Sequence, residues 1–351
     1  MKRLFAILLC VLMVVAIVAC DKPEEKQEAE YKLGMGIVVS TASSKTGNAQ
    51  VDATVATVVT DAEGKIVACR IDVAQSKMDV TDGAVDTAKA FETKMELGDR
   101  YGMAGKVDND GNGVKLEWYE QTKAFEAYVV GKTAAQVEAI ETQFVNNHYI
   151  AVDQALLDAG CSMQITDFMA AVVKACKDEQ GMSFKTAESF TLGVAAKTTA
   201  AESTAATAEA DGTVKMYSDF AASVVVDGKI IASLNDAIQP NIAINTAGEC
   251  TPAEFKGTKR ELKEAYGMAP ALNYGMDWNG DGKVLEWYVQ SAEFSKFVVG
   301  KTAAEVSAMA TKVVEGKGYV ISADDALLSA GCTIQITAIK AVVAQSVTNA
   351  R

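Results

Sequence analysis

The chain has 351 residues, of which 49% are hydrophobic, and carries a formal net charge of −13. This length and apolar content allow two domains with hydrophobic cores of ordinary size. The acidic balance disfavours binding to the phosphate backbone of nucleic acids. The sequence has one histidine, His148, so Ser-His-Asp catalysis and multi-histidine metal sites would have to be built around a single residue.

The N-terminus has the order of a bacterial secretion signal. Two basic residues precede an apolar run over residues 4–19, and Cys20 follows a small residue at its end. We therefore expect residues 1–19 to be a signal peptide and Cys20 to carry a lipid that anchors the protein outside the cytoplasm. An uncleaved anchor is the alternative, although a bilayer span needs about 20 apolar residues. Residues 20–31 are highly charged and predict a disordered tether.

The remainder of the sequence consists of one pattern written twice. Three pairs of segments recur in the same order: Leu116-Glu117-Trp118-Tyr119 with Leu285-Glu286-Trp287-Tyr288, VVGKTAA at 129–135 and at 298–304, and ALLDAGCSMQIT at 155–166 with ALLSAGCTIQIT at 326–337. Such self-similarity is typical of tandem domains. We predict a first repeat domain over residues 32–176, a linker over 177–188 and a second repeat domain over 189–349.

The sequence pattern of each copy predicts an α+β fold, in which an antiparallel sheet is followed by helices and by a final strand–helix unit. Alternating apolar residues and an intervening Gly-Lys turn predict three successive strands in the first copy, near 35–39, 51–59 and 66–73. Helical spacing follows over 118–130 and 134–144, with Thr133 and its counterpart Thr302 as N-caps. Residues 163–165 predict a short strand before the last helix of the first copy.

The turn before that last helix carries the most specific motif. In the second copy it is Ala330-Gly331-Cys332-Thr333, followed by Thr337 as the expected helix N-cap. This segment resembles the end of FMN-binding domains, which occur in flavin subunits of ion-pumping oxidoreductases and in extracellular electron-transfer flavoproteins. In that family a Ser-Gly-Ala-Thr tetrapeptide carries FMN, esterified through its phosphate to the threonine. Here alanine replaces the family's serine, and cysteine replaces its alanine.

The resemblance implies a flavin site in each copy. Thr333 would bind or esterify the flavin phosphate in the second copy, and Ser162 would do so in the first. The residues implied beside them are Gly331 and Thr337 in the second copy and Gly160 and Thr166 in the first. The turn before a helix suits a phosphate, because free backbone N–H groups and the positive end of the helix dipole lie there. Bound FMN would supply the redox chemistry.

A second motif repeats oxygen-bearing side chains at alternate positions of a loop. These residues are Asp108, Asp110 and Asn112 in the first copy and Asp277, Asn279 and Asp281 in the second, each set followed by glycine. An EF-hand-type calcium loop begins in this way, because alternate side chains point inward and glycine permits the sharp turn. The twelfth position is a tyrosine in both copies, so an ordinary tight turn is the alternative.

Two functions follow from these patterns. The first is a membrane-anchored electron-transfer flavoprotein with a redox partner in the membrane. The alternative is a non-catalytic surface binding protein, stabilised by calcium at the Asp/Asn loops. A hydrolase is disfavoured because no nucleophile–base pair is recognisable.

Overall fold

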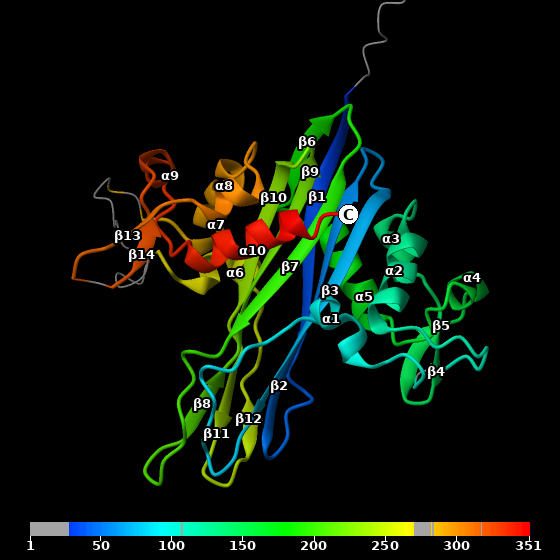
Figure 1. The fold of residues 1–351 in the computed structure, drawn as a ribbon, viewed down its shortest axis with the longest axis horizontal. Coiled ribbons are helices and arrows are strands. Elements are labelled where there is room, and N and C mark those ends of the chain that lie inside the picture. The colour runs from blue at the N-terminus through cyan, green and yellow to red at the C-terminus, as the bar shows by residue number, and fades with distance from the viewer. Residues whose placement is uncertain (1–27, 107, 270–281, 283, 317) are drawn as a thin grey trace, which may run out of the picture.

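The computed structural model describes residues 28–106, 108–269, 282, 284–316 and 318–351. The expected signal peptide and Cys20 lie outside the described residues. The α+β fold class is confirmed: the protein combines antiparallel sheets with helices. In Figure 1 the helices of the second copy lie on the left, those of the first copy lie on the right, and the strands run between them.

The first sheet has the strand order β3-β2-β1-β6, and all its pairings are antiparallel. Its strands are β1 (Ala29–Ser40), β2 (Asn48–Thr60), β3 (Ile66–Asp79) and β6 (Met182–Thr186). The Gly64 turn joins β2 to β3 at a φ of 76°, which glycine adopts without strain. Strand β6 lies within the segment expected to be a linker and pairs with β1, so that segment adds a strand to the sheet of the first copy.

The second copy builds a three-stranded sheet in the order β10-β9-β7 and a smaller one in the order β12-β11-β8. The strands of the larger sheet are β7 (Thr191–Thr199), β9 (Tyr217–Val226) and β10 (Lys229–Ile238). Those of the smaller sheet are β8 (Gly212–Lys215), β11 (Asn241–Ile244) and β12 (Cys250–Pro252). The smaller sheet continues the β9–β10 hairpin, because β8 directly precedes β9 and β11 directly follows β10. It lies at the lower end of the molecule in Figure 1.

Helices and one short hairpin follow the strands in each copy. In the first copy they are α1 (Lys94–Leu97), the 3-10 helix η1 (Gly98–Tyr101), α2 (Trp118–Val129), α3 (Ala134–Glu138), β4 (Thr142–Val145), β5 (His148–Ala151), α4 (Gln154–Asp158) and α5 (Thr166–Cys176). In the second they are α6 (Lys259–Leu262), η2 (Lys263–Tyr266), α7 (Trp287–Phe297), α8 (Ala303–Ser307), β13 (Thr311–Val313), β14 (Val320–Ser322), α9 (Asp325–Ser329) and α10 (Thr337–Thr348).

The helix predicted over residues 134–144 is shorter than expected. Its N-cap is confirmed: the Thr133 hydroxyl accepts a hydrogen bond from the Gln136 amide, and Thr302 caps α8 in the same way. The helix ends at Glu138, and the residues after it form the β4–β5 hairpin, whose turn holds Asn146 and Asn147 at positive φ angles of 49° and 65°.

The last helix of each copy also begins differently from the prediction. Residues 163–165 form no strand, and Ile165 and Ile336 occupy the N-cap positions of α5 and α10. Thr166 and Thr337, expected as N-caps, are therefore the first helical residues. Their side chains do not cap the helices.

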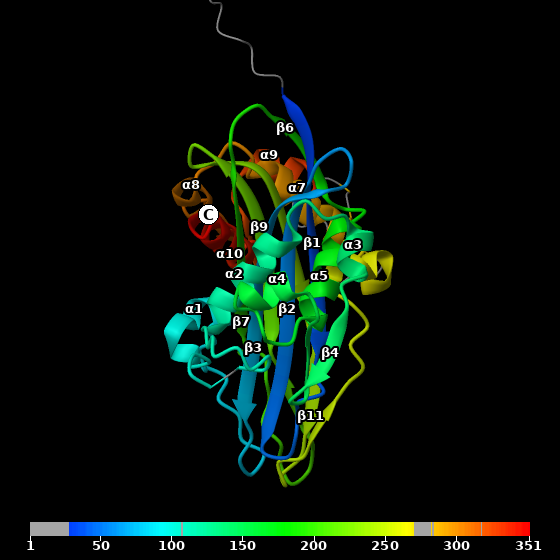
Figure 2. The same cartoon turned by 90° about the vertical axis from the view of Figure 1, so that its right-hand side faces the viewer.

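Each copy covers one face of its sheet with its own helices. Helix α5 packs on β1 and β2, and α10 packs on β9 and β7. Figure 2 looks onto the helices of the first copy, which lie in front of β1, β2 and β3. Two separate apolar cores fill these layers, one in each copy.

The other faces of the two sheets pack against each other. One continuous core joins residues of the first copy, such as Ile37 and Val55, to residues of the second, such as Val194 and Phe220. Strand β3 lies against β7 in this interface. The order of layers is helices, sheet, sheet and helices, so the two copies form one body in which each sheet is buried on both faces.

Candidate functional site

The turn expected to hold flavin in the first copy is hydrogen-bonded to helix α2. Gly160 has a φ of 89°, and the Ser162 amide donates to Gln121 Oε1 at 3.0 Å. The Ser162 side chain lies in the interior, with the residue only 2% exposed. Its hydroxyl has no hydrogen-bond partner among the described residues. The candidate acceptor oxygen is therefore shielded from solvent in this conformation.

The second copy repeats this arrangement. Gly331 has a φ of 98°, and the Thr333 amide donates to Gln290 Oε1 at 2.8 Å. The Thr333 hydroxyl donates to the same oxygen at 3.2 Å, and the residue is 4% exposed. Both predicted acceptor hydroxyls thus lie beneath the surface, each beside a glutamine of the preceding long helix.

The recurring Leu-Glu-Trp-Tyr segment has a structural role in both copies. Glu117 accepts hydrogen bonds from the Met103 and Ala104 amides, both at 2.9 Å. Glu286 accepts equivalent bonds from the Met268 and Ala269 amides. These contacts hold the loop before each long helix in place, which accounts for the repetition of the motif without a ligand.

The aromatic residues of the same region also pack in the same way in both copies. The Lys94 ammonium lies 4.9 Å from the Tyr101 ring centroid and 5.5 Å from that of Trp118. Lys259 takes the corresponding place over Tyr266 and Trp287, at 5.1 and 5.2 Å. A cation that contacts two aromatic rings stabilises the packing of these residues in each copy by about 0.5–2 kcal/mol.

The predicted calcium loop of the first copy lies directly against the predicted flavin turn. Asn109 Nδ2 donates to the Ser162 carbonyl at 2.8 Å, and Asn112 Nδ2 donates to the Leu157 carbonyl at 3.4 Å. The structure therefore brings together two motifs that lie about fifty residues apart in the sequence. The loop residues of the second copy, Asp277, Asn279 and Asp281, lie outside the described residues.

Asp108 and Asp110 occupy the first and third positions of this loop, as acidic residues do at the start of a calcium loop. Asp108 Oδ2 accepts a hydrogen bond from the Gly113 amide at 3.1 Å, across the turn. Asp108 Oδ1 and Asp110 Oδ1 are shielded from solvent, and neither has a hydrogen-bond partner in the described part of the chain. Carboxylate oxygens left in this state are costly unless a cation or another donor reaches them.

The rest of an EF-hand-type ligand set is not supplied by acidic side chains. Glu117, the nearest acid after the loop, uses both of its oxygens on backbone amides. Across the described residues, no three His, Cys, Asp or Glu side chains converge as a metal-binding cluster. A cation at Asp108 and Asp110 would need its other ligands from amide, carbonyl or water oxygens, which calcium accepts.

The cysteines at equivalent places in the two turns are buried thiols. Burial raises the pKa of Cys161 to about 12, and it raises the pKa of Cys332 to about 12 as well. The five cysteines of the described chain are all unpaired with one another. A thiol that stays protonated at neutral pH is a poor nucleophile and metal ligand, so these two side chains serve the cores.

Two buried aspartates at equivalent positions make stability dependent on pH. Burial raises the pKa of Asp72 to about 6 and that of Asp236 to about 6, against a usual value of 3.8. The folded protein therefore holds these protons more tightly than the unfolded chain, and stability falls as pH rises from about 4 to about 6. The loss is about 2–3 kcal/mol for each group. Urea unfolding across this range should show the slope, and Asp72→Asn and Asp236→Asn should each remove part of it. An unchanged slope in the double variant would contradict this assignment.

Comparison with known protein families, with curated proteins and with solved structures finds no match for this chain. Among the described residues, no helix has the length and apolar character that crossing a bilayer requires.

Proposed function

We propose that this protein is a lipid-anchored, extracytoplasmic binding protein without catalytic activity, and that the loop over residues 108–113 holds Ca²⁺. The observation that supports this most strongly is the pair of shielded, unpartnered oxygens, Asp108 Oδ1 and Asp110 Oδ1, at the first and third positions of the loop. Hard cations such as Ca²⁺ bind oxygen ligands arranged in this way. The lipid on Cys20 would keep the protein at the outer face of the cell membrane.

The Asn112 side chain would complete the loop. Its Nδ2 lies 2.6 Å from Asp110 Oδ2 and 3.4 Å from the Leu157 carbonyl oxygen, so two oxygens converge on its position. Its Oδ1 accepts from the Val114 amide at 2.7 Å, so binding a cation at this position would require the side chain to turn over and give up that bond, which would bring three oxygens together. Calcium would then fasten the loop to the turn that carries Ser162.

Calcium should therefore stabilise the mature lipoprotein in detergent. At 100 times the dissociation constant, the gain in the free energy of unfolding is about 2.7 kcal/mol over the chelated protein. The measurement is thermal or urea unfolding in EDTA and in CaCl₂. Replacing Asp108 and Asp110 together with asparagine should abolish the gain that arises from this loop.

The matched control uses the second copy. Asp277→Asn with Asp281→Asn removes the two acidic charges of the second loop and should leave the gain from the first loop in place. Equal stability of the unsubstituted protein in EDTA and in CaCl₂ would refute the calcium site. A full gain in the Asp108/Asp110 variant would refute its location.

The second candidate is the electron-transfer flavoprotein. It is supported by the turn with a positive-φ glycine and a hydroxyl residue, which stands just ahead of α5 and again ahead of α10. Flavin at Thr333 or Ser162 would require the buried turn to open. The protein purified from its own host would then be yellow, and Thr333→Ala would remove the mass of one FMN. A colourless protein of unmodified mass excludes covalent flavin.

A further inference from the structure

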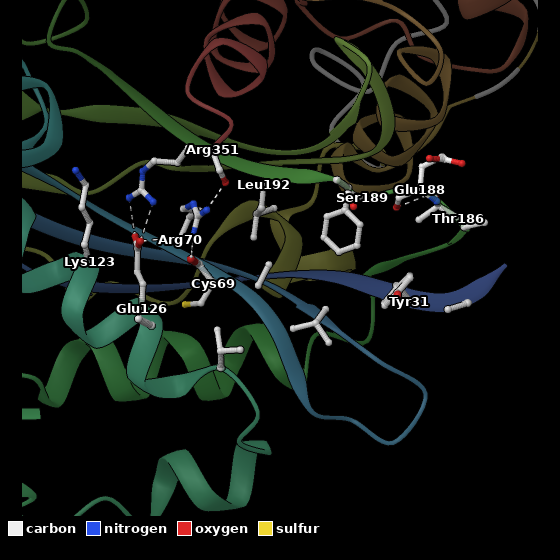
Figure 3. A pocket seen from close by; sticks show the side chains of 17 residues that line it. Tyr31, Cys69, Arg70, Lys123, Glu126, Thr186, Glu188, Ser189, Leu192 and Arg351 are labelled. Atoms are coloured by element: carbon white, nitrogen blue, oxygen red, sulfur yellow. Dashed lines mark hydrogen bonds and ion pairs between the residues drawn. The ribbon is translucent and has the colours of Figure 1, made fainter. Parts of the chain in front are cut away.

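A cavity of about 630 Å³ lies where the two copies meet, and Figure 3 shows that its charged groups already bind one another. The Arg351 guanidinium donates two hydrogen bonds to Glu126, and the Arg70 guanidinium donates to the backbone oxygens of Cys69 and Arg351. The terminal nitrogens of both arginines are therefore bonded within the chain. Unpaired backbone groups lie instead at the surface, on two short hairpins.

Each copy has a two-stranded hairpin that joins no larger sheet in the described part of the chain. The hairpin is β4 with β5 in the first copy and β13 with β14 in the second. Figure 1 places the two hairpins on opposite sides of the molecule. The first strand of each hairpin pairs only with the second, so one of its edges has no partner strand. Such an edge is a template for a strand of another chain.

The hydrogen bonds of the first hairpin show which backbone groups point outward. The Tyr149 carbonyl of β5 accepts a hydrogen bond from the Ile165 amide, outside the hairpin, at 3.1 Å. Tyr149 lies directly opposite Phe144. Residues opposed in an antiparallel ladder either exchange hydrogen bonds or both face away, so the N–H and C=O of Phe144, and those of Thr142, point away from β5. No group of the described chain bonds to them.

The hairpin of the second copy repeats this free edge. The Val314 amide donates across the hairpin to the Tyr319 carbonyl at 2.8 Å. The alternation along the strand then turns the N–H and C=O of Val313 and Thr311 outward. These groups also have no hydrogen-bond partner among the residues that the structure describes.

An exposed apolar side chain lies on each free edge. Val313 is 66% exposed and Phe144 is 61% exposed, the two highest values among the large hydrophobic side chains of the described chain. Their positions are equivalent, because each lies at the same distance after a VVGKTAA segment. The Phe144 ring also contacts that of Tyr149, with 4.9 Å between the centroids. An unpaired edge that carries exposed apolar side chains is prone to pair with another strand.

The two edges carry opposite charges. Glu141 directly precedes β4, and the equivalent residue of the second copy is Ala310. Lys312 lies at the centre of β13, where the first copy has Gln143. Glu141 and Lys312 are both exposed, and neither forms an ion pair with a described residue. The edge of β4 is therefore acidic and that of β13 is basic.

We propose that the partner of these edges is a second copy of this chain, and that β4 of one molecule pairs antiparallel with β13 of the next. The register that fits sets Phe144 opposite Thr311. Thr142 then lies opposite Val313, and these two pairs exchange four backbone hydrogen bonds. The outward groups of both edges are satisfied in this way.

The side chains also match in this register. Phe144 and Val313 become diagonal neighbours on one face of the joined hairpins, and Glu141 and Lys312 become diagonal neighbours on the other. Each molecule carries a net charge of −13, but salt at physiological strength screens charges more than about 8 Å apart, so the local pair outweighs the distant repulsion.

The contact is head-to-tail, because the two edges lie on opposite sides of one molecule, and it can repeat into rows. Its small area makes it weak in solution. The lipid anchor of the proposed function favours it by confining the molecules to one surface, which raises their effective concentration. The inference rests on the proposed function for this anchor alone and does not depend on calcium.

Cysteine cross-linking in the native membrane tests the register. Gln143 and Lys312 would lie directly opposite each other with about 4.5 Å between Cα atoms, a distance that a disulfide can span. Gln143→Cys with Lys312→Cys in one chain should therefore form a ladder of covalent oligomers under a mild oxidant. The matched control is Gln143→Cys with Val299→Cys, an exposed position of the second copy outside its hairpin, which should form little or none.

Carbodiimide cross-linking tests the contact in the unsubstituted protein. It should join the Glu141 carboxylate to the Lys312 amine, and the peptide pair is identified by mass spectrometry. Phe144→Ser should lower the yield about tenfold or more, because the phenyl ring is no longer buried between molecules, and it should spare the fold because Phe144 is exposed in the single molecule. Val130→Ser, at an exposed position after α2, is the control and should leave the yield unchanged.

Monomers alone after both reactions would overturn the inference, and so would an equal carbodiimide yield with Phe144→Ser. Dimers of Gln143→Cys alone, formed as fast as those of the double variant, would mean that β4 pairs with β4 and would refute the head-to-tail contact. Cross-linking that persists in a protein without a calcium gain would refute only the calcium loop. A calcium gain without cross-linking would refute only the association of copies.

Discussion

Replacing Arg260 with methionine is expected to lower the free energy of unfolding by about 3–5 kcal/mol, because it leaves a buried carboxylate without its partner. Arg260 Nη2 lies 3.2 and 3.1 Å from the two oxygens of Asp178 and donates to the Gln180 carbonyl at 2.8 Å. The two charged side chains are only 8% and 9% exposed. Asp178 also accepts from the Met35 amide of β1, so the pair joins the first sheet to helix α6 of the second copy.

Urea unfolding of the mature protein measures this effect. Lys263→Gln is the control, since Lys263 forms an exposed ion pair with Glu179 one turn away and should contribute at most about 1 kcal/mol. Adding Asp178→Asn to Arg260→Met should recover part of the loss by removing the unpaired charge. A loss below about 1 kcal/mol in Arg260→Met would mean that this pair does not hold the copies together.

The second large effect is expected from Gly193→Val. A Cβ atom at this position of β7 would lie 1.9 Å from the Ser346 carbonyl oxygen, so α10 would have to lift off the sheet. Overpacking against backbone costs about 1–3 kcal/mol and occasionally more, and we expect the upper end here. Gly34 has the same relation to the Ala175 carbonyl of α5, at 2.0 Å, so Gly34→Val should behave alike.

Chemical denaturation with tryptophan fluorescence would report both variants. Thr191→Val, at an exposed position of the same strand as Gly193, is the matched control and should change stability by less than about 0.5 kcal/mol. If Gly193→Val were as stable as this control, the close approach of helix and strand would not be a requirement of the fold.

Local sequence patterns predicted the fold class and the helix N-caps, which neighbouring residues determine. The α+β class and the N-caps Thr133 and Thr302 follow from periodicity and from hydrogen bonding within a few residues. The β4–β5 hairpin was missed because residues 134–144 also fit a helical pattern. The decisive feature is the Asn146-Asn147 pair, whose positive φ angles build the turn.

The packing of sheet against sheet could not be deduced from two separate repeats. Its one local signal is strand β2, in which Val51, Ala53 and Val55 face the other copy while Ala56 and Val58 face the helices. A strand buried on both faces lacks the alternation of a half-exposed one. The predicted division into two domains left the second face of each sheet without an assigned partner.

For the candidate sites, too, the sequence indicated local features but not the contacts between residues far apart in the chain. The hydroxyl residues Ser162 and Thr333 precede α5 and α10, but they are buried and their amides donate to glutamines of another helix in each copy, which the sequence alone did not indicate. The charged cavity was missed because its residues are scattered from β1 to the last residue of the chain. Differences between equivalent positions, such as Arg70 against Leu234, were the available signal.

The central claim is that the mature protein is a calcium-loaded binding protein that carries lipid and no flavin. Its most direct test is mass spectrometry of the protein purified from its own host without chelator, first under native conditions and then denatured. We predict a polypeptide that begins at lipid-modified Cys20 and retains Ca²⁺ in the native spectrum, with the ion lost when Asp108 and Asp110 become asparagine. A mass that includes FMN after denaturation, with no bound calcium before it, would contradict the claim and establish the flavoprotein instead.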